Sequence, residues 1–333
     1  MMDNSNRPKI VVLTPVRNEA WILKAFLEAT SLWADYIIIA DQMSTDGSRE
    51  ISKSYPKVIL IDNERETMHM AETRRLLFDA AKQIEGDKIL FALDADEFLY
   101  GDFEKSESWR KIINSNPDDI FNWRWMNLKQ NDATKYSYSE YFYWAVHESG
   151  NLWDGLFPDN FIHEWRLPWP KDTKDSNVVE LKDFFSIHFG KISLLRQKNK
   201  NRFYQVSTVV KDKNASKVAL YRQYHAEERL EYYDVPEDAF KYYEDKGIDI
   251  WSYVDLKDEG AYYSAEVKRY FETYGIKKFA LLDIWDKEWM NKMEIKDPRT
   301  PIQKLIHKYL HFTMRYDSCL IVRFFDKLLK LVM

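Results

Sequence analysis

Two carboxylates, Asp94 and Asp96, stand at the end of an apolar stretch, residues 89–93, and Glu97 follows them directly. Residues two apart on an extended chain point to the same side, so the two aspartates can share one hard cation or divide a cation and a ribose between them. An isolated Asp-x-Asp is also typical of a strand that ends in a solvated acidic turn. The segments that precede this pair favour the first interpretation, a site that handles diphosphates.

Four short, nearly continuous apolar runs alternate with helical patterns before these carboxylates. They cover residues 10–13, 36–40, 58–61 and 89–93. Such runs are typical of parallel strands that are covered on both faces. The segments between them predict crossover helices, the first with Ile22, Phe26 and Ala29 at helical spacing and the third over about residues 70–84. We therefore expect an open α/β sheet, which binds its ligands at the carboxyl ends of the strands.

Polar segments follow three of these apolar runs. Residues 14–19, 41–48 and 94–97 each begin where a predicted strand ends. Because the carboxyl ends of parallel strands meet at one edge of a sheet, these three loops are expected to converge on a single crevice.

The same segments resemble, in order, the motifs of the family 2 glycosyltransferases, which have the GT-A fold. The matching positions are residues 15–19, Asp41 with residues 44–48, Arg74, and residues 94–97. The second loop departs from the commonest pattern, because Gln42 and Met43 stand where an Asp-Gly pair is usual. The resemblance continues more weakly to about residue 190. It implies a GT-A-type, Rossmann-like, mostly parallel α/β sheet with an antiparallel edge portion, followed by a helical C-terminal region.

The resemblance also implies roles for single residues. It assigns the nucleotide sugar to Pro15, Arg17, Glu19, Asp41, Arg74 and Asp94, and the metal to Asp96, Asp94 and His188. Oxygen ligands and phosphate partners favour Mg²⁺ or Mn²⁺ as the divalent cation. Asp96 is also expected to matter for catalysis, because a cation held there carries the charge of the departing diphosphate.

The chemistry of Asp41 and of two arginines agrees with these roles. A carboxylate such as Asp41 can accept the imide hydrogen of a pyrimidine base, which favours a uridine nucleotide. Arg17 and Arg74 can offer planar forks of donors to ribose, base or phosphate oxygens. The alternatives are a helix cap for Asp41 and surface ion pairs for the arginines.

Residues 121–128 and 141–146 predict further strands, antiparallel to the edge of the first sheet. Beyond them, His163 and Glu164 resemble a His-Glu pair that many members of the family carry after such a hairpin, where the carboxylate faces the acceptor. An inverting transfer needs a base within hydrogen-bond reach of the attacking hydroxyl, and Glu164 is predicted to be that base.

Other residues compete for these roles. Asp154 and Asp159 are the alternative bases, and an earlier pair, His147 and Glu148, is the alternative His-Glu motif. His188 lies where the family has its next histidine motif. It either joins the metal or diphosphate site or is a buried histidine bonded to the backbone.

Length and composition indicate an enzyme of two parts. We expect a nucleotide-sugar-binding catalytic domain over residues 1–193 and a mainly helical region over residues 194–333. The single Cys319 cannot form an internal disulfide, no stretch approaches the ~18 apolar residues of a spanning helix, and the first residues lack the apolar core of a signal peptide. These features predict a cytoplasmic protein. A net charge of −5 argues against broad nucleic-acid binding.

The terminal segment, residues 302–333, alternates apolar pairs with basic residues and predicts a basic amphipathic helix. Such a helix can lie in an anionic membrane surface, where a lipid-linked acceptor would be found. Docking onto the protein's own core or onto a dimer partner explains the pattern equally well. Peripheral contact with the inner face of a membrane is therefore one of two expectations.

Together these features predict a metal-dependent, inverting, family-2-like glycosyltransferase. It would move a sugar from a nucleotide diphosphate donor, with UDP favoured, to a hydroxyl of a glycan or lipid-linked glycan. The resemblance alone suggests lipopolysaccharide or capsule assembly. A nucleotidyltransferase that makes an activated sugar is one alternative, but residues 14–19 lack the glycine that its triphosphate loop usually needs. A non-catalytic glycan-binding scaffold with the same fold is the other.

Overall fold

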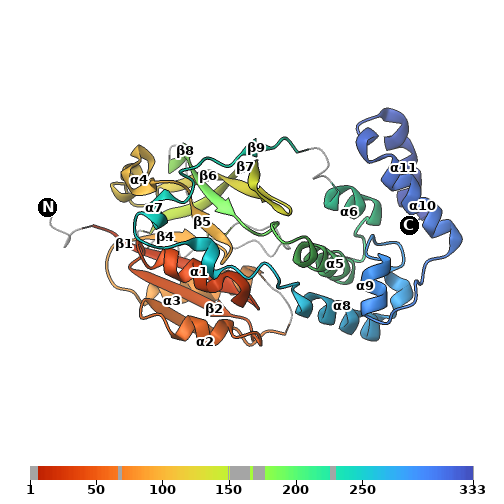
Figure 1. Ribbon diagram of the computed structural model, residues 1–333, viewed down its shortest axis with the longest axis horizontal. Helices are drawn as coiled ribbons and strands as arrows, with labels where there is room; N and C mark the ends of the chain where they lie inside the picture. The colour runs from red at the N-terminus through yellow and green to blue at the C-terminus, as the bar shows by residue number, and fades with distance from the viewer. Residues whose placement is uncertain are drawn as a thin grey trace. The chain divides into compact units, whose positions relative to one another are not determined.

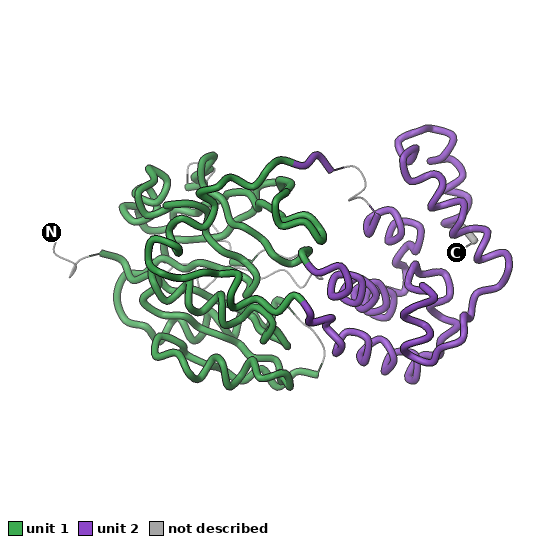
Figure 2. Tube along the Cα trace, in the orientation of Figure 1, with its two compact units in different colours: residues 1–192, 233–256 green, residues 193–232, 257–333 purple. Residues whose placement is uncertain are grey.

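The computed structural model describes residues 7–66, 70–148, 150, 166–167, 177–225 and 230–332. The chain forms two compact units (Figure 2). Unit 1 contains residues 1–192 and 233–256, and unit 2 contains residues 193–232 and 257–333. The chain therefore leaves unit 1, enters unit 2, and returns once before it ends in unit 2.

Unit 1 is built on one mixed sheet (Figure 1). Its strands are β1 (Lys9–Val16), β2 (Tyr36–Asp41), β3 (Val58–Asp62), β4 (Lys88–Ala92), β5 (Glu97–Leu99), β6 (Ile120–Lys129), β7 (Asp132–Glu148), β8 (Val178–His188) and β9 (Tyr233–Asp234). The order is β3-β2-β1-β4-β7-β6-β8-β5, and β9 pairs with β7. The first four strands pair in parallel, whereas β4–β7, β6–β7 and β5–β8 are antiparallel. This topology confirms the predicted parallel sheet with an antiparallel portion.

Helices cover both faces of the parallel strands. Unit 1 contains α1 (Ala20–Thr30), α2 (Ser48–Lys53), α3 (Met70–Lys82), η2 (Phe103–Lys105), α4 (Glu107–Ile113), α7 (Lys241–Glu244) and η6 (Ile250–Tyr253). Val12 of β1 lies in the same buried cluster as Ile22 and Phe26 of α1, whereas its neighbour Val11 lies in a second cluster with Leu77 of α3. Successive strand residues point to opposite faces, so a strand buried on both sides must be apolar throughout.

Residues 233–256 complete the core around β5. The hydroxyl of Tyr243 donates to the backbone oxygen of Leu99 over 3.0 Å, and its ring packs edge-on against Phe98. The backbone N–H of Asp255 donates to the backbone oxygen of Trp21 in α1. The short strand that follows the Asp94 segment is therefore held by a part of the chain more than a hundred residues away in sequence.

Unit 2 is helical, as predicted for the C-terminal region. It contains α5 (Leu194–Lys211), α6 (Lys217–Tyr224), α8 (Ala261–Tyr274), η7 (Ile276–Phe279), α9 (Lys287–Lys292), α10 (Pro301–Phe312), η8 (Met314–Tyr316) and α11 (Leu320–Val332). Phe271 of α8 packs against Phe279 and Trp285 in its core. Among the helices that the structure describes, none is both long and apolar enough to cross a membrane.

Candidate active site

The loops that follow β1 and β2 are joined by hydrogen bonds. Asn18 adopts a left-handed conformation, with φ of 56°, and its backbone N–H donates to Ser44 Oγ over 2.9 Å. Its side-chain Oδ1 accepts the N–H of Thr45 at 2.8 Å. Asp46 Oδ2 accepts the N–H of Ala20, the first residue of α1. The two predicted nucleotide loops therefore hold each other in place at the carboxyl ends of their strands.

Asp41 ends β2, and its side chain is almost fully buried. One oxygen, Oδ2, accepts the N–H of Ser44 and lies 3.3 Å from Arg49 Nη1. The other oxygen, Oδ1, is buried and has no hydrogen-bond partner among the described residues. A buried acceptor left without a donor costs ~1–3 kcal/mol. A ligand that brings a donor to Oδ1 would recover that cost.

Three further residues of the first loop were predicted to bind the nucleotide sugar. Pro15 is part of β1. Arg17 Nη1 donates to the backbone oxygen of Glu66 at 3.4 Å. Glu19 Oε2 accepts the indole N–H of Trp21 at 2.6 Å, so this carboxylate supports the start of α1.

Arg74 connects α3 to the Asp94 segment. Its guanidinium is buried, and Nη2 lies 3.3 Å from Asp94 Oδ1. The second terminal nitrogen, Nη1, is buried and has no hydrogen-bond acceptor among the described residues. Burial lowers the pKa of Arg74, and the charge of Asp94 partly opposes this shift. The unused donor of a cationic fork is suited to a phosphate or ribose oxygen.

A second arginine, Arg166, binds the same carboxylates, and the sequence analysis did not identify it. Its Nη2 lies 2.7 Å from Asp94 Oδ2, and its Nη1 donates to Glu97 Oε2 at 2.8 Å. The guanidinium also lies over the rings of Trp144 and Trp125, 4.4 and 5.2 Å from their centroids. Guanidinium groups stack on aromatic rings and pair with carboxylates through two nitrogens. Arg166 makes both kinds of contact and so holds Asp94 and Glu97 in place.

Glu97 is almost fully buried. Burial raises its pKa to about 8, although the neighbouring Arg166 acts in the opposite direction. Its Oε2 also accepts the backbone N–H of Asp94 at 3.2 Å. Glu97 therefore shapes the turn that carries the aspartates.

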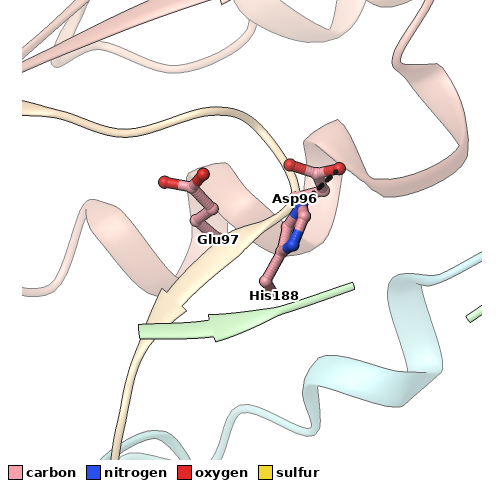
Figure 3. Close-up of side chains that lie close together, drawn as sticks. All are labelled: Asp96, Glu97 and His188. Atoms are coloured by element: carbon pink, nitrogen blue, oxygen red, sulfur yellow. Dashed lines mark ion pairs between the residues drawn. The ribbon is translucent and has the colours of Figure 1, made fainter. Parts of the chain in front are cut away.

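Asp96, Glu97 and His188 form a cluster that could hold a metal ion (Figure 3). One ligand atom from each lies within 4.8 Å of the others. The sheet brings them together, because Glu97 of β5 lies opposite His188 of β8 and the N–H of Phe189 donates to the backbone oxygen of Asp96. Asp94, which was predicted to share the metal, is ion-paired with Arg74 through one oxygen and with Arg166 through the other.

The hydrogen bonds of His188 leave one ring nitrogen for the cluster. Its Nδ1 lies 2.7 Å from Asn127 Oδ1, an atom that only accepts, so Nδ1 carries the proton. In the neutral ring, Nε2 then has a lone pair, and it lies 3.5 Å from Asp96 Oδ2. Two acceptors that face each other require a proton or a cation between them. Trp125 stacks on the imidazole at 4.5 Å and fixes its plane. This is the pattern of a metal-binding histidine oriented by a second hydrogen bond.

Gly190 leaves the room that this pair needs. A Cβ added at Gly190 would lie 2.4 Å from His188 Nε2 and 2.9 Å from Asp96 Oδ2. A side chain at this position would therefore force His188 or Asp96 to move.

Gly190→Ala is expected to weaken Mn²⁺ binding about 10- to 100-fold, the usual cost of disturbing the surroundings of a metal ligand. Isothermal titration with Mn²⁺ measures the effect, and UDP binding without metal, which is expected to depend on Asp41 and Arg74, serves as the control. Unchanged Mn²⁺ affinity in a folded variant would show that His188 and Asp96 do not bind the ion.

The predicted base, its two alternatives and the histidine predicted beside it all lie outside the described residues. They are Glu164, Asp154, Asp159 and His163.

The competing His-Glu pair lies at the other end of the sheet. Glu148 is opposite Lys88 at the start of β4 and ion-paired with it at 3.2 Å. His147 Nε2 lies 2.8 Å from Asp87. Because β4 runs from this end toward Asp94, the pair stands a full strand away from the candidate site.

Residues 11–159 match the family described as Glycosyl transferase family 2. This match confirms the resemblance on which the sequence analysis relied. This part of unit 1 is therefore similar to a family 2 glycosyltransferase domain, and the match covers a little under half of the chain. A search of curated proteins finds no match to the chain.

Solved structures show weaker similarity. Glucosyl-3-phosphoglycerate synthase from Mycobacterium tuberculosis, solved with Mn²⁺, UDP and glucosyl-3-phosphoglycerate, is 15% identical over 36% of this chain and 44% of its own, with a TM-score of 0.27. GalNAc-T7 with UDP, GalNAc and Mn²⁺ is 11% identical over 84% of this chain and 59% of its own, with a TM-score of 0.36. A 4-diphosphocytidyl-2C-methyl-D-erythritol synthase is 12% identical over 44% of this chain and 78% of its own, with a TM-score of 0.29. The aligned part spans less than two thirds of the first two structures, and TM-scores this low do not support conclusions about the reaction.

Proposed function

We propose that this protein is a metal-dependent, inverting glycosyltransferase that transfers a sugar from a UDP-type donor to a hydroxyl of a glycan or lipid-linked glycan. The observation that carries the proposal is a group of polar side chains at one edge of the sheet. Among the described residues, Asp41 Oδ1 has no hydrogen-bond donor and Arg74 Nη1 has no acceptor, while Asp96 Oδ2 lies 3.5 Å from His188 Nε2. A nucleobase would pair with Asp41, a phosphate or ribose would pair with Arg74, and a divalent cation would bind to Asp96 and His188.

Asp41 is proposed to bind the nucleobase. Uracil offers an imide N–H, and the free Oδ1 would accept it. Arg49, 3.3 Å from the other oxygen, keeps a positive charge beside the carboxylate. Guanine offers a comparable N–H but is larger, and adenine presents only an acceptor at that ring nitrogen. A uridine nucleotide is therefore the favoured donor.

Asp96 and His188 are proposed to hold Mg²⁺ or Mn²⁺, with Glu97 beside them. When bound, the ion supplies positive charge to the diphosphate as it leaves the sugar. Arg74 is proposed to donate its free Nη1 to the same donor. Asp94, fixed by two arginines, is proposed to accept hydrogen bonds from the ribose or the transferred sugar.

Glu164 is proposed to remove the proton of the attacking hydroxyl. An inverting transfer joins the acceptor oxygen to the anomeric carbon as the bond to the diphosphate breaks, and the hydroxyl proton passes to a carboxylate. The proposal rests on the position of this residue after the predicted hairpin, as described above.

Nucleotide release separates this function from the two alternatives. A panel of UDP-sugars is incubated with Mn²⁺ and a hydroxyl acceptor, and free UDP is measured. Release of UDP supports a glycosyltransferase. Formation of pyrophosphate from UTP and a sugar phosphate would indicate a nucleotidyltransferase instead, and binding of sugars without either product would indicate a scaffold.

Asp41→Ala is expected to weaken UDP binding by ~1–3 kcal/mol, the range for loss of a hydrogen bond to a charged group. Calorimetry with Mn²⁺ present measures this effect. Asp62→Ala is the matched control, because Asp62 is also paired with Arg49 but is largely exposed. Equal affinity of Asp41→Ala and the wild type for UDP, or tighter binding of adenine nucleotides, would contradict the assignment of the base.

A further inference from the structure

Helices α10 and α11 of unit 2 expose an unusual number of large apolar side chains. Leu320 is 80% exposed and Phe312 is 77% exposed. The apolar residues exposed on this part of the chain are Ile302, Leu305, Phe312, Tyr316, Leu320, Ile321, Phe324, Phe325 and Leu328. We call this set the C-terminal surface. Exposed apolar residues are common singly, but so many within one short part of the chain indicate an interaction site.

The exposed residues of α11 form an apolar stripe and a basic stripe on different faces of the helix. Ile321, Phe324, Phe325 and Leu328 are spaced by 0, 3, 4 and 7 residues, so they share one helix face. The basic residues follow the same rule on a second face. They are Arg323, Lys327 and Lys330, with spacings of 0, 4 and 7. A pattern of one apolar and one basic face is typical of a helix that lies in a membrane interface.

A third face of α11 packs on the rest of unit 2. Val322 is buried, and both oxygens of Asp326 accept hydrogen bonds from Arg222 of α6, at 3.0 Å each. The hydroxyl of Tyr309 in α10 donates to Asp326 as well. Docking onto the protein therefore uses a different face from the apolar stripe. It also neutralises the acidic residue within α11.

The charge of this region is opposite to that of the whole chain. Residues 301–333 contain six Lys or Arg and two Asp, a net charge of +4, whereas the whole chain has a net charge of −5. A helix with one exposed apolar face and a separate basic face complements a surface that is negatively charged outside and apolar beneath.

We infer that the C-terminal surface binds the interface of an anionic lipid bilayer. The apolar stripe would enter the boundary between head groups and acyl chains, and Arg323, Lys327 and Lys330 would contact the lipid phosphates. A second copy of the chain is the weaker candidate, because a symmetric dimer would bring two surfaces of +4 together. Asp326 is held by Arg222 and does not offset this repulsion.

Flotation of the full-length protein with vesicles tests the inference. Phosphatidylcholine vesicles with added phosphatidylglycerol are compared with phosphatidylcholine alone, at low and at high salt. We expect binding only to the anionic vesicles, and a loss of at least tenfold at high salt, because basic residues act through a screened attraction. Equal binding to both vesicle types, or none at low salt, would overturn the inference.

Two sets of variants identify the surface. Arg323→Gln, Lys327→Gln and Lys330→Gln together are expected to reduce affinity for anionic vesicles roughly a hundredfold, at about fivefold for each basic residue. The matched control makes the same charge change at Lys213, Lys268 and Lys287, which are exposed elsewhere in unit 2. Equal losses in both sets would indicate a general charge effect and would contradict a specific surface.

The apolar stripe is tested in the same way. Phe324→Ser with Leu328→Ser should reduce binding at least tenfold, whereas Leu195→Ser with Leu256→Ser, two exposed leucines outside the surface, should not. Circular dichroism confirms that each variant is folded. If the stripe variant binds vesicles normally but loses a concentration-dependent dimer in sedimentation, the surface joins two copies and the lipid assignment is wrong.

Discussion

Asp96→Ala is expected to reduce metal-dependent sugar transfer at least ~1,000-fold. Removing one group that stabilises transition-state charge typically costs ~100- to 1,000-fold, and loss of the cation also removes a template for the donor. His188 would lose the acceptor that faces it at 3.5 Å. Initial rates of UDP release with saturating Mn²⁺ measure the effect, and a Mn²⁺ titration tests directly whether the ion is still bound.

The fold should tolerate this substitution. The backbone oxygen of Asp96, which accepts the N–H of Phe189, is unchanged by it, so the contact of its segment with β8 remains. Asp79→Ala, on the exposed side of α3, is the control for loss of an aspartate in unit 1. Near-normal turnover of Asp96→Ala, with wild-type dependence on Mn²⁺, would remove Asp96 from the metal site.

The parallel half of the sheet was predictable because β1, β2 and β4 are buried along almost their whole length, and the edge strand β3 is apolar although only partly buried. Strands covered on both faces are apolar at nearly every position, a pattern that a sequence displays without knowledge of tertiary contacts. The predicted runs at residues 36–40 and 58–61 lie within β2 and β3 as observed. The segment after β4 was predictable for the same reason, since the sequence changes abruptly from apolar residues to carboxylates at Asp94.

The surroundings of the candidate metal cluster, Asp96, Glu97 and His188, were not predictable from local sequence patterns. The pairing of β5 with β8 joins residues about 90 positions apart, and nothing in the local pattern of either strand indicates its partner. Asn127 orients His188 only because β6 and β8 are neighbours. Arg166 has no periodic or motif signal, yet it pairs with Asp94 and Glu97. Such contacts depend on the order of strands in the sheet, and local spacing contains no information about that order.

Gly190 is an intermediate case. Its sequence neighbourhood resembled a family motif, but the reason for glycine is visible only in the structure, where a Cβ would meet His188 and Asp96. The return of residues 233–256 to unit 1 is a clearer example of a feature that the sequence does not reveal. Tyr243 of this segment donates a hydrogen bond to Leu99 in β5. The sequence did not indicate that this segment interrupts unit 2.

Glu164→Gln is expected to reduce transfer at least ~100-fold while leaving donor affinity nearly unchanged. Glutamine has almost the same shape as glutamate but cannot take the proton of the acceptor hydroxyl, and general-base catalysis typically contributes ~100- to 10,000-fold. Loss of kcat with unchanged donor binding is the signature of a group that acts in the transition state. Transfer rates with a saturating acceptor, together with calorimetry of UDP and Mn²⁺, separate the two effects.

Asp154→Asn and Asp159→Asn are the matched substitutions, because each makes the same carboxylate-to-amide change at an alternative base. If Glu164 is the base, both should keep most of the activity, and only Glu164→Gln should lose the acidic limb of the pH–rate profile that reports protonation of the base. Full activity of Glu164→Gln with a loss in one of the aspartate variants would move the assignment to that aspartate. Comparable small losses in all three would mean that the proton leaves to solvent or to the diphosphate, and the mechanism would then need no protein base.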